Sequence, residues 1–259
     1  MKITVVGGTG LIGTTVVRLL QGQGHDVVTA ARATGVNSYT GEGLPEALEG
    51  ASVVVDVSNS SYVDEAAARE FFYASTLNLL TYGDLAGVGH HVTLSVVGTD
   101  RLARAQGGYF IAKQQQERLI MTSGRPFSIV HSTQFFEFIR AIADSAAAHR
   151  SPRLPDVQVR PIAADDAAAA VAGAALSAPT SAIREVAGPE TFGLRDLAMM
   201  DLRFRQDDRE LPPDPLGTYF GARLARTDLL PGPAAEIMPT RYHQWRVARP
   251  LAGWPVGRR

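Results

Sequence analysis

The sequence predicts an α/β fold in which a parallel β-sheet is covered by helices on both faces. Three observations lead to this prediction. A short β-branched strand, a glycine-rich turn and a helical pattern follow one another at the amino terminus. A continuous apolar run at 53–57 is typical of a parallel strand buried on both faces. Strand and helix patterns then alternate along a chain of 259 residues, which is long enough to bury a full core in one domain.

The composition excludes several classes of protein. A formal net charge of −1 provides no global field that would attract nucleic acid or an anionic membrane. The absence of cysteine excludes disulfides and thiolate metal ligands. No apolar run approaches the roughly 20 residues of a membrane span, and the early apolar stretch is not a convincing signal peptide. We therefore expect a cytoplasmic protein with no nucleic acid and no membrane among its partners, and its oligomeric state stays open.

The amino-terminal glycine turn predicts a dinucleotide site. Its glycines follow the strand at 2–6 with the spacing G-x-x-G-x-x-G. A side chain at Gly7 or Gly10 would obstruct the tight turn or the approach of a pyrophosphate, while Gly13 lets the helix pack closely on the strand. The helix start offers free N–H groups and a positive dipole end. An ordinary strand-turn-helix connection is the alternative. We expect cofactor contacts from Gly7, Thr9, Gly10, Leu11, Ile12 and Gly13.

The end of the second strand, at 25–32, favours NADP(H) over NAD(H). In folds that prefer NAD, an acidic residue about 20 positions past the glycine turn binds the ribose 2′-hydroxyl. This chain has Arg32 there and no acid. An arginine suits a 2′-phosphate, although a surface cation is the alternative. Val57 and Ser58 end the next strand and should lie at the same sheet edge, where we expect them to contact the cofactor.

The later elements follow from periodicity and turn residues. Successive strand side chains point to opposite faces, so the adjacent His90 and His91 cannot easily share an ion, and we predict no metal. Residues 207–239 are rich in proline and predict a long loop or lid, with a simple surface wrap as the alternative. We expect strands over 53–57, 90–98, 127–131, 153–162 and 185–189. We expect helices over 45–48, 66–80, 109–123, 138–148, 165–176 and 194–205. Asp165 or Asp166 should cap the helix at 165–176, and Thr240 should cap a last short helix.

Tyr109 and Lys113 form the predicted reactive pair. Positions i and i+4 share one helix face, and a phenol beside an ammonium should have its pKa lowered, as a general acid for a carbonyl oxygen requires. The chain has 25 basic residues, of which only Lys2 and Lys113 are lysines. Ser95 can present a hydroxyl from the end of a neighbouring strand. A surface tyrosine with a solvated lysine is the alternative.

Two aromatic segments predict the substrate pocket. Gln134, Phe135 and Phe136 leave the carboxyl end of the strand at 127–131, where a polar and then aromatic segment suits a pocket wall. A helix start with core phenylalanines is the alternative. Tyr219 and Phe220 lie between proline-rich flanks and can act as a lid or simply anchor the chain. This composition favours a small apolar substrate.

Several stretches of the chain together resemble a known family. They are the glycine turn, Leu94-Ser95-Val96-Val97-Gly98, Tyr109 with Lys113, Glu117-Arg118-Leu119-Ile120, the stretch 123–130, Gln134-Phe135-Phe136 and the stretch 161–166. On these residues the chain resembles an atypical short-chain dehydrogenase/reductase of the NmrA-like group. The resemblance implies a Rossmann fold with a small carboxyl-terminal substrate lobe: a single domain over 1–259, with 1–135 mainly binding cofactor and 136–259 adding late strands and the lobe.

The resemblance also implies roles for the reactive residues. Tyr109 would donate a proton, Lys113 would hold the nicotinamide ribose and tune Tyr109, and Ser95 would help to position a substrate carbonyl. We therefore predict an NADP(H)-dependent oxidoreductase that reduces a carbonyl, enone or quinone of a small apolar molecule. The same group includes NADP(H)-sensing regulators without turnover and non-redox enzymes, which are the alternatives.

Overall fold

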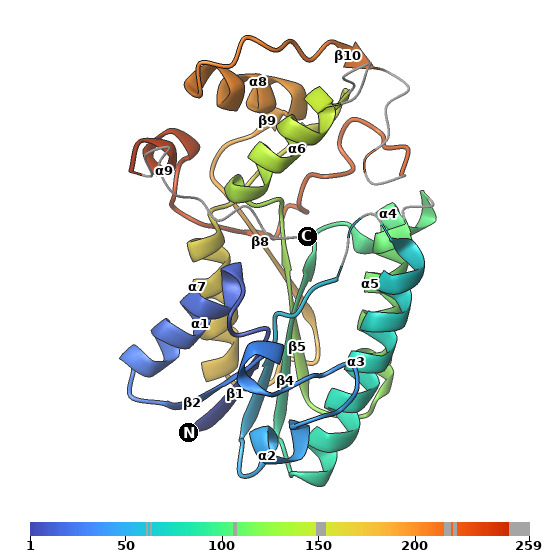
Figure 1. Ribbon diagram of the computed structural model, residues 1–259, viewed down its shortest axis with the longest axis vertical. Coiled ribbons are helices and arrows are strands. Elements are labelled where there is room, and N and C mark those ends of the chain that lie inside the picture. The colour runs from blue at the N-terminus through green and yellow to red at the C-terminus, as the bar shows by residue number, and fades with distance from the viewer. Residues whose placement is uncertain are drawn as a thin grey trace.

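The structure, a computed structural model, describes residues 1–60, 62, 64–105, 108–148, 154–214, 219 and 222–248. Its centre is a parallel sheet of seven strands in the order β11-β8-β5-β4-β3-β1-β2 (Figure 1). The strands of this sheet are β1 (Lys2–Val6), β2 (Asp26–Ala30), β3 (Val53–Asp56), β4 (His90–Val96), β5 (Phe127–Ser132), β8 (Ile183–Ala187) and β11 (Glu236–Ile237).

Helices cover both faces of this sheet, which confirms the predicted α/β architecture. One face carries α1 (Leu11–Gly22) and α7 (Ala164–Leu176), and the other carries α3 (Glu65–Leu85) and α5 (Gly108–Thr122) (Figure 1). The short α4 (Thr99–Arg104), which was not predicted, packs beside α5. In the described part of the chain, no helix combines the length and apolar character needed to cross a bilayer.

The order of the strands determines where a ligand can bind. The wholly described stretch between β2 and β3 contains only a 3₁₀ turn at Arg32–Thr34 and α2 (Leu44–Leu48), with no further strand of the sheet. The chain therefore adds β2 on one side of β1 and β3 on the other. This reversal opens a crevice between the carboxyl ends of β1 and β3, the position at which doubly wound sheets bind ligands.

A small lobe stands above the carboxyl ends of the strands (Figure 1). The predicted strand at 153–162 is instead two short strands in separate two-stranded sheets. The stretch 207–239, predicted as a loop or lid, supplies the edge strand β11 of the main sheet. The lobe comprises α6 (Phe136–Ala148), α8 (Leu194–Phe204), α9 (Tyr242–Ala248), β6 (Leu154–Pro155), β7 (Gln158–Val159), β9 (Phe192–Gly193) and β10 (Pro213–Asp214).

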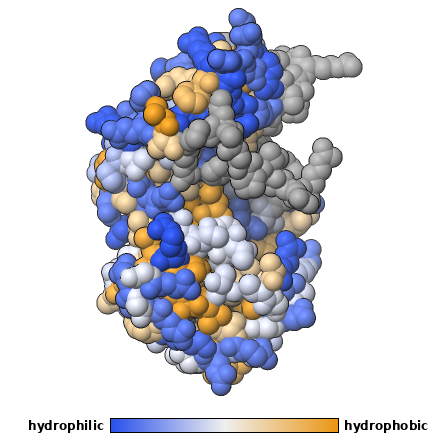
Figure 2. All heavy atoms as spheres, turned by 60° about the vertical axis from the view of Figure 1, so that its left-hand side comes forward, coloured by the Kyte–Doolittle hydropathy of each residue, from blue (hydrophilic) through white to orange (hydrophobic). Residues whose placement is uncertain are grey.

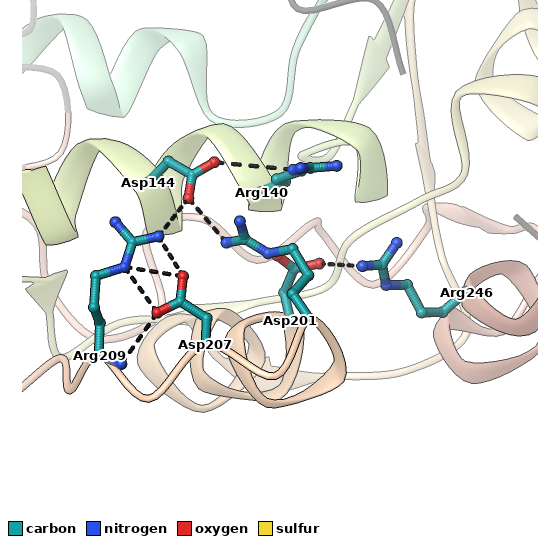
Figure 3. A network of polar contacts seen from close by, with 7 residues as sticks. Arg140, Asp144, Asp201, Asp207, Arg209 and Arg246 are labelled. Atoms are coloured by element: carbon teal, nitrogen blue, oxygen red, sulfur yellow. Dashed lines mark hydrogen bonds and ion pairs between the residues drawn. The ribbon is translucent and has the colours of Figure 1, made fainter. Parts of the chain in front are cut away.

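Ion pairs join the three helices of the lobe (Figure 3). Arg205 on the carboxyl-terminal end of α8 pairs with Asp144 of α6 at 2.9 Å and with Asp201 of α8 at 2.9 Å. Asp201 also forms an ion pair with Arg246 of α9 at 3.2 Å, and both of these side chains are buried. A buried pair of this kind costs much to break, so the network fixes α9 against α8.

The start of α7 differs from the prediction. Neither Asp165 nor Asp166 is its cap, because the helix already begins at Ala164. The Ala164 N–H instead donates to Glu137 Oε2 of α6 at 3.1 Å. Asp165 accepts a hydrogen bond from Thr15 of α1 at 3.0 Å and so links the two helices on this face. The lobe thus caps a helix of the sheet layer.

The start of α9 also differs from the prediction. Thr240 does not cap this helix, because its hydroxyl and its N–H both donate to Asp166, each at 3.0 Å. The helix begins at Tyr242, whose N–H donates to Glu190 Oε2 at 3.0 Å. The carboxyl-terminal helix is therefore held by acidic residues from two distant parts of the chain.

The glycine turn is fixed by close backbone contacts. Gly7 has φ +79°, and a Cβ there would lie 2.8 Å from the Ser58 nitrogen. A Cβ on Gly13 would lie 2.1 Å from the Gly7 carbonyl oxygen and 2.6 Å from the Gly8 Cα. A Cβ on Gly10 would meet only the Gly7 oxygen, at 3.2 Å. The turn itself therefore requires glycine at 7 and 13, as predicted, while Gly10 is only mildly restricted by the chain.

We expect Gly13→Ala to destabilise the protein by at least about 1–3 kcal/mol, because the new methyl group would push α1 away from the turn. The free energy of unfolding in urea measures this effect. Gly22→Ala is the matched control in the same helix, since nothing lies within 4 Å of a Cβ there, and it should be neutral or stabilising by up to about 1 kcal/mol. Equal stability of Gly13→Ala and the wild type would contradict the packing described here.

Candidate functional site

A cleft of about 1070 Å³ runs along the carboxyl ends of the strands, beneath the lobe. Ligand pockets commonly measure about 300–1,000 Å³, so this cleft has room for an extended ligand together with a smaller one. On the face shown in Figure 2, apolar and near-neutral residues gather across the middle of the molecule below a mainly hydrophilic lobe. The predicted site residues that line the cleft are Gly7, Thr9, Gly10, Leu11, Ile12, Arg32, Val57, Ser58, Ser95, Tyr109, Lys113, Gln134, Phe135 and Tyr219.

Two of the described residues in the predicted set do not line it. Gly13 lies behind the turn, as its packing role requires. Phe136 is a core residue with 2% exposure, whose ring packs against Tyr242 and Trp245 with centroids 5.3 Å away in each case. The prediction that Phe136 binds substrate is therefore wrong, and the alternative of a core phenylalanine is correct for this residue. Phe220 lies outside the described residues.

One end of the cleft suits an anionic ligand. The first turn of α1 holds no acidic residue, and its N-cap Gly10 offers no side chain to the free N–H groups. These groups and the positive end of the helix dipole therefore face the cleft without a competing side chain. Arg32 lines the same end, and its guanidinium makes no hydrogen bond or ion pair with any residue that the structure describes. These groups fit the phosphates of a dinucleotide.

Tyr109 lies deep in the other end of the cleft. It is 5% exposed, and its hydroxyl donates to Asn59 Oδ1 at 2.8 Å. Asn59 in turn donates through Nδ2 to the hydroxyl of Tyr62 at 2.7 Å. Burial raises the pKa of Tyr109 well above its usual value, and Tyr62 and Tyr219 raise it further. The predicted lowering of this pKa is wrong, and at neutral pH Tyr109 is a protonated phenol that can donate.

Lys113 follows Tyr109 by one turn of α5, but its ammonium points into a buried polar network. Nζ donates to the Leu94 carbonyl at 3.0 Å and to Gln116 Oε1, and it lies 4.6 Å from the centre of the Phe72 ring. Burial lowers the pKa of Lys113 to about 8, although the charges of Asp56 and Glu117 act in the opposite direction. Lys113 is therefore mainly cationic at pH 7 and mainly neutral above pH 8.

Ser95 does not offer its hydroxyl hydrogen to the cleft. The side chain is 2% exposed and donates to Glu117 Oε1. Glu117 also accepts from His131 at 2.9 Å. Burial acts to raise the pKa of Glu117, but the bonds from His131 and Ser95 outweigh it, and the pKa is lowered. Ser95 is therefore bound to a charged carboxylate, and its predicted role in positioning a substrate carbonyl has no support in this geometry.

Two polar residues near the site were missing from the predicted set. Asn59 follows the predicted contacts Val57 and Ser58 directly and is the partner of Tyr109. Asp56 is the single carboxylate within an apolar strand run, and its buried Oδ2 accepts from Gln116 at 3.0 Å. Both features were visible in the sequence as polar side chains at the end of a buried strand.

The histidines that suggested a metal have other surroundings. His90 Nε2 lies 2.9 Å from the Ser128 hydroxyl. His91 is buried, and its pKa is lowered to about 4 by burial. Among the residues described, no group of three or more histidine, aspartate or glutamate side chains is arranged to hold a metal ion.

Comparisons with known proteins agree with this geometry. Residues 3–79 match the model of the NAD dependent epimerase/dehydratase family. Similarity to solved structures shows that the chain has a Rossmann-type fold. It superposes on dTDP-4-dehydrorhamnose reductase from Bacillus anthracis in complex with NADP with a TM-score of 0.70 at 11% identity, covering 94% of this chain and 95% of the other. For UDP-N-acetylglucosamine 4-epimerase from Bacillus cereus the TM-score is 0.63 at 19% identity, covering 83% and 85%.

One curated relative is similar in sequence over part of the chain. It is the photosystem II assembly factor Ycf39 of Synechocystis sp., which is 32% identical over 111 residues. The match covers 38% of this Rossmann-fold chain and only 34% of the relative. The predicted fold is thus confirmed, while the substrate and the reaction are not defined by these relatives.

The buried ammonium of Lys113 should make stability depend on pH. Between its folded pKa of about 8 and a higher unfolded value, the unfolded chain binds more protons, so this group makes stability rise with pH. We expect Lys113→Met to lose this contribution. The free energy of unfolding of Lys113→Met, relative to that of the wild type, should therefore decrease by roughly 2 kcal/mol from pH 7 to pH 9.5. Urea denaturation of both proteins at each pH gives this difference, and a pH-independent difference would contradict the buried ammonium.

Proposed function

We propose that this protein is an NADP(H)-dependent oxidoreductase that reduces a carbonyl, enone or quinone of a small apolar molecule. One observation carries the proposal: a protonated Tyr109 and a cationic Lys113 stand at one end of a single cleft whose other end is an anion-binding helix start. The matched family is described as NAD dependent, and one structural neighbour is a reductase in complex with NADP, which supports a nicotinamide cofactor.

The cleft residues define how such a cofactor would be held. The start of α1 would bind the pyrophosphate and Arg32 the 2′-phosphate, with Val57 and Ser58 beside the dinucleotide. Lys113 would bind the nicotinamide ribose. When bound, the reduced nicotinamide supplies the hydride. The protein's own contribution is to orient the reactants and exclude water.

Tyr109 is the proposed proton donor. Its hydroxyl hydrogen is already directed at a carbonyl-type oxygen, Asn59 Oδ1, at 2.8 Å. A substrate carbonyl that replaced Asn59 as acceptor would receive this hydrogen bond and then the proton.

A cofactor-sensing role without turnover is the second candidate. The relative in Synechocystis sp. is named as an assembly factor. Tyr109 is 5% exposed, and Tyr62 and Tyr219 lie close to it. In a sensor, cofactor binding would change a surface that a protein partner reads, and Tyr109 would have no chemical task. Cofactor binding without turnover of ketones, enones and quinones, together with a specific protein partner, would favour this candidate.

We expect Arg32→Asp to weaken NADPH binding about 10- to 100-fold, because a charge-assisted bond to the 2′-phosphate is replaced by repulsion. NADH binding should change by less than about threefold. Titration of intrinsic or cofactor fluorescence measures both affinities. Arg18→Asp is the control, since Arg18 is an exposed arginine of α1 outside the cleft. Equal losses for NADPH and NADH would remove Arg32 from 2′-phosphate recognition.

We expect Tyr109→Phe to lose turnover by about 10²- to 10⁴-fold, the usual contribution of a positioned general acid. NADPH affinity should stay within about twofold of the wild type. The rate of NADPH oxidation with a ketone or quinone substrate is the measurement, and Tyr73→Phe on the exposed side of α3 is the control. Turnover at the wild-type rate in Tyr109→Phe would exclude the phenol from the reaction.

A further inference from the structure

We propose that Gln134 selects an uncharged, planar substrate that carries an N–H group beside a carbonyl, as a lactam does. The inference rests on the proposed function, because it assigns the substrate class of the same cleft. It starts from the buried side-chain amide of Gln134, which no residue in the described part of the chain satisfies.

The position of Gln134 is fixed by its backbone. It follows β5, and its carbonyl accepts from the Ile162 N–H at 2.9 Å. The Ile162 carbonyl in turn accepts from the Phe136 N–H at 2.9 Å, so the segment is held on both sides of Gln134. Its side chain is 7% exposed and lines the cleft. The amide is therefore presented from a rigid segment.

The side-chain amide of Gln134 makes no hydrogen bond within the part of the chain that the structure describes. Neither Oε1 nor Nε2 has a hydrogen-bond partner among the residues that the structure describes. The Tyr219 phenol lies near enough to Gln134 for the amide to lower the pKa of Tyr219, although burial raises that pKa by more. The two side chains do not have the geometry of a hydrogen bond. Leaving a buried donor and acceptor unpaired is costly, so such groups normally bind a ligand or water.

A second unsatisfied group adjoins the first. Thr133 is 2% exposed, lines the same cleft, and its Oγ1 is also without a hydrogen-bond partner among the described residues. A primary amide offers an acceptor and a donor side by side, and a hydroxyl can serve as either. The complement of the amide is a ligand edge with a donor beside an acceptor, which a lactam provides.

The walls around these groups suit a flat molecule. The rings of Tyr62 and Phe138 lie 5.0 Å apart, and the rings of Phe110 and Tyr219 are stacked at 6.2 Å with an angle of 19° between their planes. All four residues line the cleft. Aromatic side chains gain most from contact with planar groups in stacked or edge-on arrangements.

The charges of the described lining residues favour an uncharged substrate. These are Arg32, Lys113 and Glu137. Arg32 follows β2, far along the sheet from β5, and Lys113 is engaged with Leu94 and Gln116. Glu137 also lines the cleft, and its carboxylate accepts from the Ala164 N–H and from the Trp245 indole N–H. The described part of this end therefore offers no arginine or lysine of its own to a phosphate or carboxylate.

The experiment compares two probes that differ by one methyl group. Isatin is planar and has a ketone next to a lactam, while N-methylisatin lacks only the N–H donor. Isothermal titration of the full chain, saturated with NADP⁺, gives the affinity for each without requiring turnover. We expect isatin to bind about tenfold more tightly than N-methylisatin, the usual effect of one hydrogen bond to a buried partner.

The variants assign this preference to the amide. In Gln134→Leu, and in Gln134→Met as a second substitution, the two probes should bind within about twofold of each other, with NADP⁺ affinity unchanged as the sign of a folded site. Gln115→Leu, at a position of α5 outside the cleft, should keep the tenfold preference. The proposal would be overturned if the wild type bound the two probes equally or bound neither. It would also be overturned if Gln134→Leu and Gln134→Met kept the preference for isatin over N-methylisatin.

The failure of this inference can be told apart from failure of the proposed function. If NADPH does not bind, the cofactor site is wrong. If NADPH binds and isatin shows the expected preference but is not reduced, the recognition by Gln134 holds while the reductase role fails. If carbonyl compounds are reduced without any preference between the probes, the reductase role holds and the substrate class proposed here is wrong.

Discussion

The cleft depends on one close backbone contact, the packing of Gly13 on the carbonyl of Gly7. A Cβ on Gly13 would lie 2.1 Å from that oxygen, so α1 can start directly against the turn only when this residue is glycine. The contact directs the free N–H groups of α1 toward the crevice between β1 and β3. Arg32 stands at the end of β2, the neighbour of β1 on its other side, so the anion-binding end is assembled from adjacent strands.

The opposite end of the cleft depends on a buried polar layer between the sheet and α5. Asp56 of β3 binds Gln116, and Gln116 binds Lys113. Glu117, one turn after Lys113, binds Ser95 and His131. Each charged group is satisfied by neighbours, as burial requires. This layer holds the Lys113 ammonium in place, and it explains why Ser95 serves the network rather than a substrate.

Much of the fold could be predicted from the sequence, because strand and helix patterns are local. The glycine turn, β3 and α5 were predicted within a few residues of their observed bounds. What failed depended on contacts between distant residues. The pKa of Tyr109 is set by burial and by Tyr62 and Tyr219, not by Lys113 one turn away. Whether Phe135 or Phe136 faces the cleft depends on how the segment pairs with Ile162. The strand β11 has only two residues, which is too short for an alternating hydrophobic pattern.

Polar groups that a ligand could bind follow one another along the cleft. At one end lie the uncapped start of α1 and Arg32. Beyond this anion-binding end, the phenol of Tyr109 donates to Asn59, a partner that a substrate could replace. Near the β5 end lie Thr133 and Gln134, whose buried side chains make no hydrogen bonds with the described residues. Local violations of this kind are expected at functional sites. The anion-binding groups come first, the proton donor next and the neutral polar edge last. A dinucleotide and an uncharged substrate would meet across the strand ends in this same order.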